Sequence, residues 1–169
     1  PSPFISTKTR SKLFDAAIQL AKKVNYQNAG TIEFIVDRKE NFYFLEMNTR
    51  LQVEHPITEW TTGIDIVKEQ VKIAAGEKLF LKQKEILRYG HSIECRICAE
   101  DPKTYLPSTG KIVELHSPSG PRLRLDSALY QGYDIPVFYD SLLSKLTSWG
   151  PTRTEAIQTM KRALSEYQI

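Results

Sequence analysis

Two acidic side chains on neighbouring predicted strands could together bind a divalent cation. Glu33 is the acidic residue of the stretch TIEFIV, and Glu46 belongs to the stretch FYFLEMN. If residues 38–41 form the turn between them, the two carboxylates lie directly opposite each other, and such like charges repel. A hard cation such as Mg²⁺ or Mn²⁺ removes this repulsion, and Asn48 on the same face adds an amide oxygen. With a different strand register, the same residues form only a solvated face of a hairpin.

Three more polar side chains follow at alternating positions. In an extended chain, Arg50, Gln52 and Glu54 share a face with Glu46 and Asn48, because alternate side chains point to the same side. A planar guanidinium suits a small oxyanion such as bicarbonate, and a carboxylate within hydrogen-bond reach can act as a general base. Each residue alone is equally consistent with an ordinary surface ion pair, which contributes little. The shared spacing of all five favours a reaction surface.

The first half of the chain carries two predicted helices and one predicted hairpin that would position these residues. Apolar residues recur at helical spacing over residues 9–24 and 64–75. Residues 31–48 read as two strands around the polar turn RKEN, in which Asp37 pairs with Phe42. His55 precedes Pro56, which favours an extended or turn conformation at His55.

The second half has the pattern of short strands separated by Pro, Gly and Ser turns. The strand candidates are HSIECRICAE, GKIVELHS, PRLRLDS and SLLSKLTSWG. A last helix begins at about Arg153, where Thr152 and Glu155 form a capping box. The segment rich in Lys and Glu before Gly90 predicts a boundary, and we expect domains over residues 1–82 and 83–169 in an α+β fold.

Composition excludes several classes of protein. The 169 residues carry a net charge of only +3 and no block of Lys or Arg, which argues against a nucleic-acid partner. No apolar run has the length of a membrane span. Cys95 and Cys98, three residues apart on a predicted strand, face opposite sides, so we expect structural thiols and a cytoplasmic protein, with metal or redox roles as the alternative. The chain begins without Met, and we expect a piece of a longer protein.

The string FLEMNTRLQVEHPITEWTTGIDIVKEQVKIAAGEKL resembles the signature of the biotin carboxylase family of ATP-grasp enzymes. The resemblance continues through GHSIECRICAEDP, YLPSTGKI and RLDSALYQGYDIPVFYDSLLSKL, and it covers essentially the whole chain. Related enzymes such as carbamoyl phosphate synthetase share the E-x-N-x-R core but are not expected to continue with Q-V-E-H-P. The resemblance implies the C-terminal part of an ATP-grasp sheet with flanking helices, followed by a small, mostly antiparallel biotin carboxylase C-terminal domain that is incomplete at its end.

The resemblance also assigns roles to matching residues. Glu33 and Glu46 match divalent-metal ligands, and Asn48 matches a residue at the metal–phosphate site. The remaining matches are the bicarbonate pocket, formed by Arg50, Gln52 and the backbone of Val53, the base Glu54, and Arg124, which steadies carboxyphosphate and the enolate-like oxygen of biotin. Arg50, Glu54 and Arg124 are therefore the predicted catalytic residues.

A reaction and a set of partners follow from the same resemblance. ATP phosphorylates bicarbonate, and the carboxyl group of carboxyphosphate passes to biotin on a carrier protein, for use by a carboxyltransferase. We expect a homodimer when full-length, in a biotin-dependent carboxylase such as the acetyl-CoA carboxylase of fatty acid biosynthesis. The sequence does not distinguish acetyl-CoA, propionyl-CoA, methylcrotonyl-CoA or pyruvate as the final acceptor. The glycine-rich ATP lid and the N-terminal domain precede this region, so the isolated chain is expected to be inactive. The alternative is a non-catalytic ATP-grasp remnant that acts in the assembly of subunits.

Overall fold

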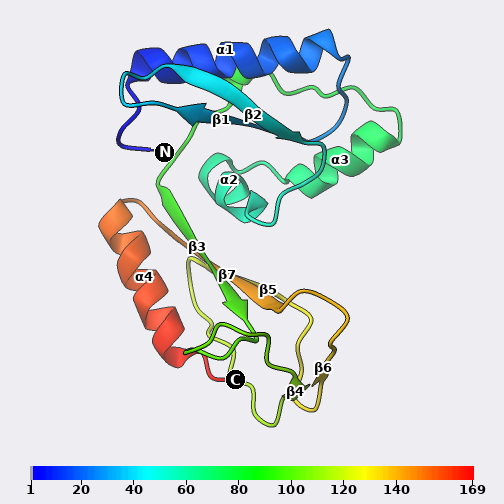
Figure 1. Cartoon of the computed structure of the whole chain (residues 1–169), viewed down its shortest axis with the longest axis vertical. Helices are drawn as coiled ribbons and strands as arrows, with labels where there is room; N and C mark the ends of the chain where they lie inside the picture. Colours follow the sequence, from blue (N-terminus) through cyan, green and yellow to red (C-terminus); the bar gives the residue numbers. More distant parts are fainter. Residues whose placement is uncertain (1) are drawn as a thin grey trace. The chain divides into compact units, whose positions relative to one another are not determined.

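Figure 1 shows a computed structural model, which describes residues 2–169. The chain divides into two compact units. The first unit holds the residues up to His55 together with Asp65–Phe80, and the second holds Pro56–Ile64 together with Leu81–Ile169. Both units combine helices with antiparallel strands, which confirms the predicted α+β class.

The first unit consists of helix α1 (Thr7–Lys23), strands β1 (Thr31–Val36) and β2 (Phe42–Asn48), and helix α3 (Ile66–Ala74). Helix α1 agrees with the predicted helix to within two residues at its start and one at its end. The predicted helix over residues 64–75 corresponds to α3, whose N-cap Asp65 accepts a hydrogen bond from the backbone of Lys68 at 2.8 Å.

The turn of the hairpin is shorter than predicted. The backbone N–H of Asp37 donates to the carbonyl of Asn41 at 2.9 Å, and Phe42 pairs with Val36, so the predicted pairing of Asp37 with Phe42 is wrong. Three residues therefore form the loop, and the last of them, Glu40, has a left-handed backbone with φ of 61°. The Asp37 carboxylate closes the turn by accepting from Asn41, which lowers the pKa of Asp37.

A β-bulge restores the pairing on which the metal prediction depends. Glu33 lies opposite Glu46, as predicted, although Phe34 pairs with Phe44. Leu45 is therefore an extra residue of β2, and the ladder shifts by one position there. Without this bulge, Phe42, Phe44 and Glu46 would share one face, because strand side chains alternate. The bulge places Phe44 with Phe34 and turns Glu46 to the side of Glu33.

Strand β2 ends at Asn48, and the chain does not stay extended through residue 54 as predicted. Thr31, the first residue of β1, pairs with Asn48, so the ladder offers no partner strand beyond this point. An additional helix, α2 (His55–Thr62), begins at His55, where an extended or turn conformation was predicted. Proline is tolerated in the first turn of a helix, where its missing N–H is not needed.

The second unit is built on a three-stranded antiparallel sheet in the order β3–β7–β5. Its strands are β3 (His91–Cys98), β5 (Leu123–Ser127) and β7 (Leu142–Gly150), with a small pair β4 (Gly110–Lys111) and β6 (Asp134–Ile135). The predicted strand GKIVELHS is thus reduced to two residues. A short 3₁₀ turn, η1 (Gln83–Glu85), lies in the segment before the sheet.

Helix α4 (Arg153–Glu166) covers the sheet of the second unit. Its predicted capping box is confirmed, because Thr152 and Glu155 exchange hydrogen bonds. Leu146 of β7 packs with Met160 and Ala163 of α4 in a buried core cluster. No helix within residues 2–169 combines the length and apolar character needed to cross a membrane.

The two cysteines are free thiols on opposite faces of β3. Cys95 pairs with Leu146 and packs against the core cluster, and burial raises the pKa of its thiol. Cys98 instead lines a cavity with Leu143. Cys95 thus takes part in the packing of the second unit, while the structural role of both thiols stays a prediction.

Candidate functional site

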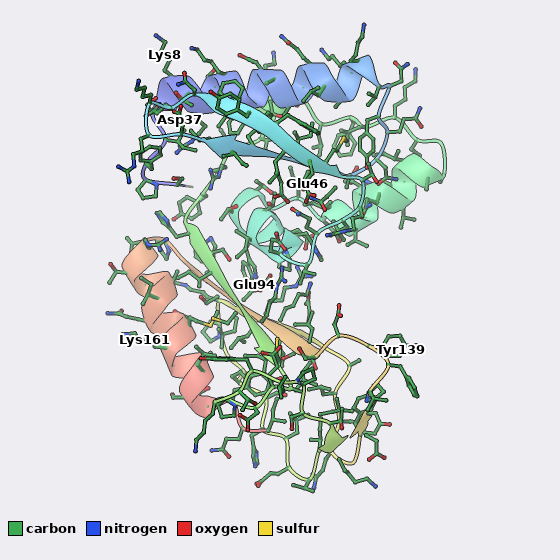
Figure 2. All side chains as sticks on the ribbon, viewed as in Figure 1. Lys8, Asp37, Glu46, Glu94, Tyr139 and Lys161 are labelled. Carbon is green, nitrogen blue, oxygen red and sulfur yellow. The ribbon has the colours of Figure 1, made fainter. Side chains whose placement is uncertain are left out.

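The carboxylates of Glu33 and Glu46 converge on the side chain of Asn48. The Asn48 Nδ2 group donates to Oε1 of Glu33 at 2.9 Å and to Oε1 of Glu46 at 3.2 Å. Figure 2 shows Glu46 on the side of the hairpin away from helix α1. The sheet register and the bulge thus bring together the three residues predicted to bind a metal.

The donor set fits a hard divalent cation. Two carboxylates and an amide are oxygen ligands of the kind that Mg²⁺ prefers. Residues 2–169 contain no cluster of three or more His, Cys, Asp or Glu side chains placed to hold a metal, so a cation here would depend on Asn48 as the third ligand. Asn48 points its NH₂ group toward the carboxylates, and its oxygen accepts from Arg50 Nη2 at 3.3 Å. The amide must therefore turn over before its oxygen can reach a cation.

Arg50 lies in the irregular loop over residues 49–54, which connects β2 to helix α2. Its Nη1 donates to the carbonyl of Leu51 at 3.1 Å, and its side chain is exposed. The next fixed point is the carbonyl of Gln52, which accepts from the backbone of His55 at 3.2 Å and lies 2.8 Å from His55 Nδ1. His55 therefore pins the turn that contains Val53 and Glu54.

Four of the predicted residues thus form one hydrogen-bonded chain, from Glu33 and Glu46 through Asn48 to Arg50. The other predicted bicarbonate residues follow on the loop, where Glu54 is exposed and Gln52 and Val53 are partly buried. They lie on a turn and not on the strand face that their spacing predicted. A carboxylate and a guanidinium on an exposed loop can reach a small substrate without a movement of the sheet.

Arg124, the remaining predicted residue, belongs to strand β5 of the second unit and lies in an ionic cluster. Its Nε and Nη2 donate to the two oxygens of Asp126 at 2.7 and 3.0 Å, and its Nη1 donates to Glu59 at 2.5 Å. Lys145 of β7 contacts Asp126 at 3.2 Å. The sequence reading missed both carboxylate partners of Arg124.

The charges of this cluster shift two pKa values. The hydrogen bond to Asp126 raises the pKa of the Arg124 guanidinium against the opposing effect of burial, and the bond to Glu59 raises it further. Burial acts to raise the pKa of Asp126, but the hydrogen bonds from Arg124 and Lys145 outweigh it and lower that pKa below its ordinary value. Arg124 and Asp126 therefore stay ionised at neutral pH.

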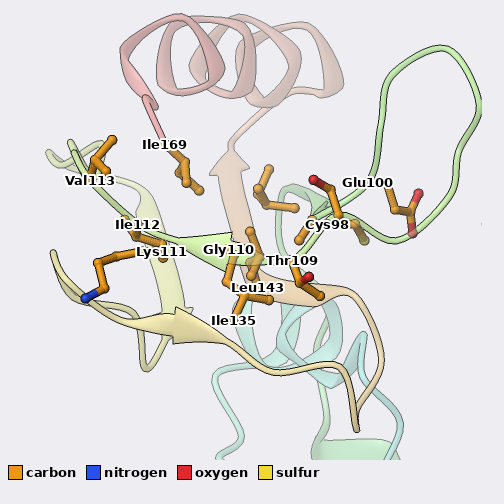
Figure 3. Close-up of a pocket in the computed structure, with 13 residues that line it drawn as sticks. Cys98, Glu100, Thr109, Gly110, Lys111, Ile112, Val113, Ile135, Leu143 and Ile169 are labelled. Carbon is orange, nitrogen blue, oxygen red and sulfur yellow. The ribbon is translucent and has the colours of Figure 1, made fainter.

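A cavity of about 400 Å³ in the second unit has a different lining. Figure 3 shows it between the β4 segment, Leu143 and the C-terminal residue Ile169. Its side chains are mostly apolar, with Glu100 and Lys111 at its edges. None of the predicted metal, bicarbonate or catalytic residues lines this cavity. The candidate residues are therefore described within each unit, on the hairpin and loop of the first and in the Arg124 cluster of the second.

Two models of known protein families match consecutive parts of the chain. Residues 1–82 match the model for the ATP binding domain of the carbamoyl-phosphate synthase L chain. Residues 94–169 match the model for the biotin carboxylase C-terminal domain.

Individual relatives match the chain from end to end. It is 54% identical to one of the pyruvate carboxylase subunits of Methanothermobacter thermautotrophicus over 100% of this chain and 34% of that protein. It is 52% identical to the biotin carboxylase of Nostoc sp. over 100% of this chain and 38% of that protein. The chain thus spans little more than a third of the length of these curated relatives.

Solved structures agree in sequence and in fold. A biotin carboxylase–β,γ-ATP complex from Campylobacter jejuni has a TM-score of 0.93 and 49% identity, over 99% of this chain and 37% of that one. The biotin carboxylase domain dimer of Hydrogenobacter thermophilus 2-oxoglutarate carboxylase, with MgADP, ADP and bicarbonate, has a TM-score of 0.94 and 48% identity, over 100% of this chain and 38% of that one. The chain belongs to the biotin carboxylase family, as the C-terminal part of an ATP-grasp domain followed by the biotin carboxylase C-terminal domain.

Proposed function

We propose that the full-length protein carrying this chain is a biotin carboxylase, an ATP-dependent ligase that carboxylates biotin on a carrier protein. The observation that supports this most directly is the convergence of Glu33, Glu46 and Asn48 beside Arg50. Such a set can bind the cation of a nucleotide next to a guanidinium that binds an oxyanion. The complex of MgADP and bicarbonate in the related H. thermophilus domain supports both halves of this assignment.

In the proposed reaction, Glu54 accepts the proton of bicarbonate, which is held by Arg50, the Gln52 side chain and the Val53 backbone. A bicarbonate oxygen then attacks the γ-phosphorus of ATP, and the bond from this phosphorus to the oxygen that bridges it to ADP breaks. ADP departs, and carboxyphosphate is formed. The carbon–oxygen bond to phosphate breaks as the ureido nitrogen of biotin takes the carboxyl group. The proton of that nitrogen passes to the departing phosphate, which is released as inorganic phosphate. Arg124 stabilises the oxygens on which negative charge develops.

The metal belongs to the same proposal. Mg²⁺ or Mn²⁺ held by Glu33, Glu46 and Asn48 would neutralise charge on the phosphate oxygens during phosphoryl transfer. The partners that we propose are a biotin carrier protein or domain and carboxyltransferase subunits, with a homodimer as the full-length state and the cytoplasm as the location. The naming of one relative as part of a pyruvate carboxylase with several subunits supports such an assembly.

ADP release by the full-length protein tests the proposal. It is measured with bicarbonate and Mg²⁺, with and without free biotin, for the wild type and for Glu54→Gln. We expect biotin to stimulate ADP release and the variant to lose this stimulation by about 10²–10⁴-fold, the usual contribution of a general base. ADP release that does not depend on biotin would indicate that ATP phosphorylates another carboxylic acid. No ADP release at all would support the alternative of a non-catalytic ATP-grasp remnant.

The 169-residue chain alone should release no ADP above background under the same conditions, because it spans only 34–38% of its catalytic relatives. A matched assay with the full-length protein at equal concentration serves as the positive control. Turnover by the chain alone would show that the nucleotide needs no further segment.

A further inference from the structure

The guanidinium of Arg124 is held from two sides by carboxylates of different elements. Asp126 lies two residues further along β5, so both side chains share a strand face, and it accepts from Nε and Nη2 in a bidentate pair at 2.7 and 3.0 Å. Glu59 comes from helix α2 and accepts from Nη1 at 2.5 Å. One bidentate carboxylate already forms a complete ion pair with an arginine, so the second carboxylate adds a further restraint on Arg124.

The burial of the cluster indicates a fixed arrangement. The side chain of Glu59 is 11% exposed and that of Lys145 is 14% exposed. Lys145 contacts the same Asp126 oxygen that accepts from Arg124 Nη2, so Asp126 is fixed between two cations. Two cations and two carboxylates balance in charge, which allows all four to stay ionised in a partly desolvated place.

The contacts leave a defined pair of donors. A guanidinium has five N–H groups, and the three bonds described above use one each on Nε, Nη1 and Nη2. One N–H therefore remains on each terminal nitrogen. Because the plane of the group is set by Glu59 and Asp126, the direction of these two N–H groups is also set.

We infer that Glu59 and Asp126 are positioning residues of the carboxylation reaction, which fix the direction in which Arg124 presents its two remaining N–H groups. This inference rests on the proposed function, in which Arg124 touches the reacting groups. The two carboxylates also offset the charge of Arg124, so it attracts a bound anion less than a lone guanidinium does. Arg124 therefore stabilises most an oxygen that becomes negative only during the reaction. Such an interaction acts on kcat more than on KM.

A double-mutant cycle in the full-length protein tests the inference. The variants are Glu59→Gln, Asp126→Asn, Arg124→Ala and the two doubles with Arg124→Ala. We expect each single carboxylate variant to lower kcat for biotin-dependent ADP release by about 10–100-fold through misdirection of Arg124, with the KM for ATP and for bicarbonate unchanged. In the Arg124→Ala background, the same substitutions should lower kcat no further. Glu166→Gln removes an exposed carboxylate partner of Arg162 in the same unit and is the matched control.

Rescue of activity by guanidinium ion is a second measurement. It should show no effect if Glu59 and Asp126 have a purely structural role. Guanidinium ion at millimolar concentration should restore part of the kcat of Arg124→Ala, because Glu59 and Asp126 still form its binding site. The Arg124→Ala/Asp126→Asn double variant should show no rescue. Additive losses in the cycle, equal rescue of single and double variants, or a loss that follows the melting temperature would each overturn the inference. A wild type without biotin-dependent ADP release would instead overturn the proposed function, and the inference with it.

Discussion

At the scale of single residues, the amide of Asn48 donates to both carboxylates of the opposed pair Glu33 and Glu46. Two carboxylates across a ladder repel each other, and a group with two N–H donors stabilises them in place of a cation. The pair is therefore compatible with the fold when no metal is bound. The cost of losing that donor should appear only in the absence of metal.

Asn48→Asp tests this role of the amide. It removes both hydrogen bonds and adds a third negative charge, so we expect the hairpin to lose about 1–3 kcal/mol of stability without divalent cations. Mg²⁺ at millimolar concentration should recover most of this loss, because three carboxylates bind it well. The measurement is hydrogen exchange of the backbone amides of residues 31–48 in the full-length protein, with chelator and with Mg²⁺.

Asn41→Asp is the matched control. Asn41 also donates to a carboxylate, that of Asp37, at 2.8 Å, but it lies in the turn away from the opposed pair. The stability that Asn41→Asp loses should not be recovered by Mg²⁺. If Asn48→Asp exchanges no faster than the wild type in chelator, the bridging role of the amide is wrong.

At the scale of elements, the turn of the hairpin is tied to the start of helix α1 by the side chain of Glu40. Its carboxylate accepts from the backbone and the hydroxyl of Ser6, at 3.2 and 2.5 Å, and from the hydroxyl of Thr9. These side-chain hydrogen bonds, with that from Ser6 first, lower the pKa of Glu40 below its ordinary 4.5. One carboxylate thus links Ser6, the N-cap of α1, to the turn of the hairpin.

The lowered pKa gives a pH dependence with a defined sign. A group whose folded pKa is depressed adds stability above its unfolded pKa, and this stability is lost as the pH falls through the folded pKa. We therefore expect the wild type to have a higher melting temperature than Glu40→Gln at neutral pH. This difference in melting temperature should vanish well below pH 4.5. Melting curves of both proteins across this range check the sign; a difference that grows on acidification would contradict it.

Most elements could be predicted from the sequence, because their signals are local. The capping box of α4 and the strand around Cys95 depend on residues a few positions apart. The partner Asp126 could have been found in the same way, since it lies two residues from Arg124 on one strand face. Glu59 could not, because its contact spans 65 positions and no pattern connects the two residues.

The pairing of Glu33 with Glu46 was predicted correctly through two errors that cancel. The turn was expected to be one residue longer than it is, and the bulge at Leu45 was not foreseen. A bulge has no marker in this stretch, where Leu45 fits the alternation of a regular strand. The loop over residues 49–54 was missed for the same reason, since polar and apolar residues alternate there without a partner strand.

At the scale of the whole chain, apolar burial is uneven between the two units. Among residues 2–169, every buried member of the apolar core lies in the second unit, from Ala99 to Ala163. The first unit exposes large side chains such as Phe14, Tyr43 and Phe44 by more than half. We expect the second unit of this chain to unfold cooperatively and the first to exchange its amides at much lower free energy.

Leu146→Ala should destabilise the second unit by about 2–5 kcal/mol, because the side chain is fully buried and leaves a cavity against Met160. Leu142→Ala on the same strand, where the side chain is 36% exposed, should cost distinctly less. Denaturant unfolding of the chain gives both values. Amide exchange in residues 31–48 should change little in either variant. A change there as large as that in the second unit would show that the core stabilises both units.

The aromatic stack of the second unit has an optical consequence. Trp60 and Trp149 are the 2 tryptophans of the chain, and their rings stack at 6.5 Å with 20° between their planes, while Tyr89 lies 5.5 Å from Trp149. Selective excitation of tryptophan therefore reports on the second unit and gives no signal from the hairpin that carries Glu33 and Glu46. A Tyr43→Trp substitution, at an exposed position of β2, would add an emitter to the first unit. The two units could then be followed separately, by fluorescence, in one sample.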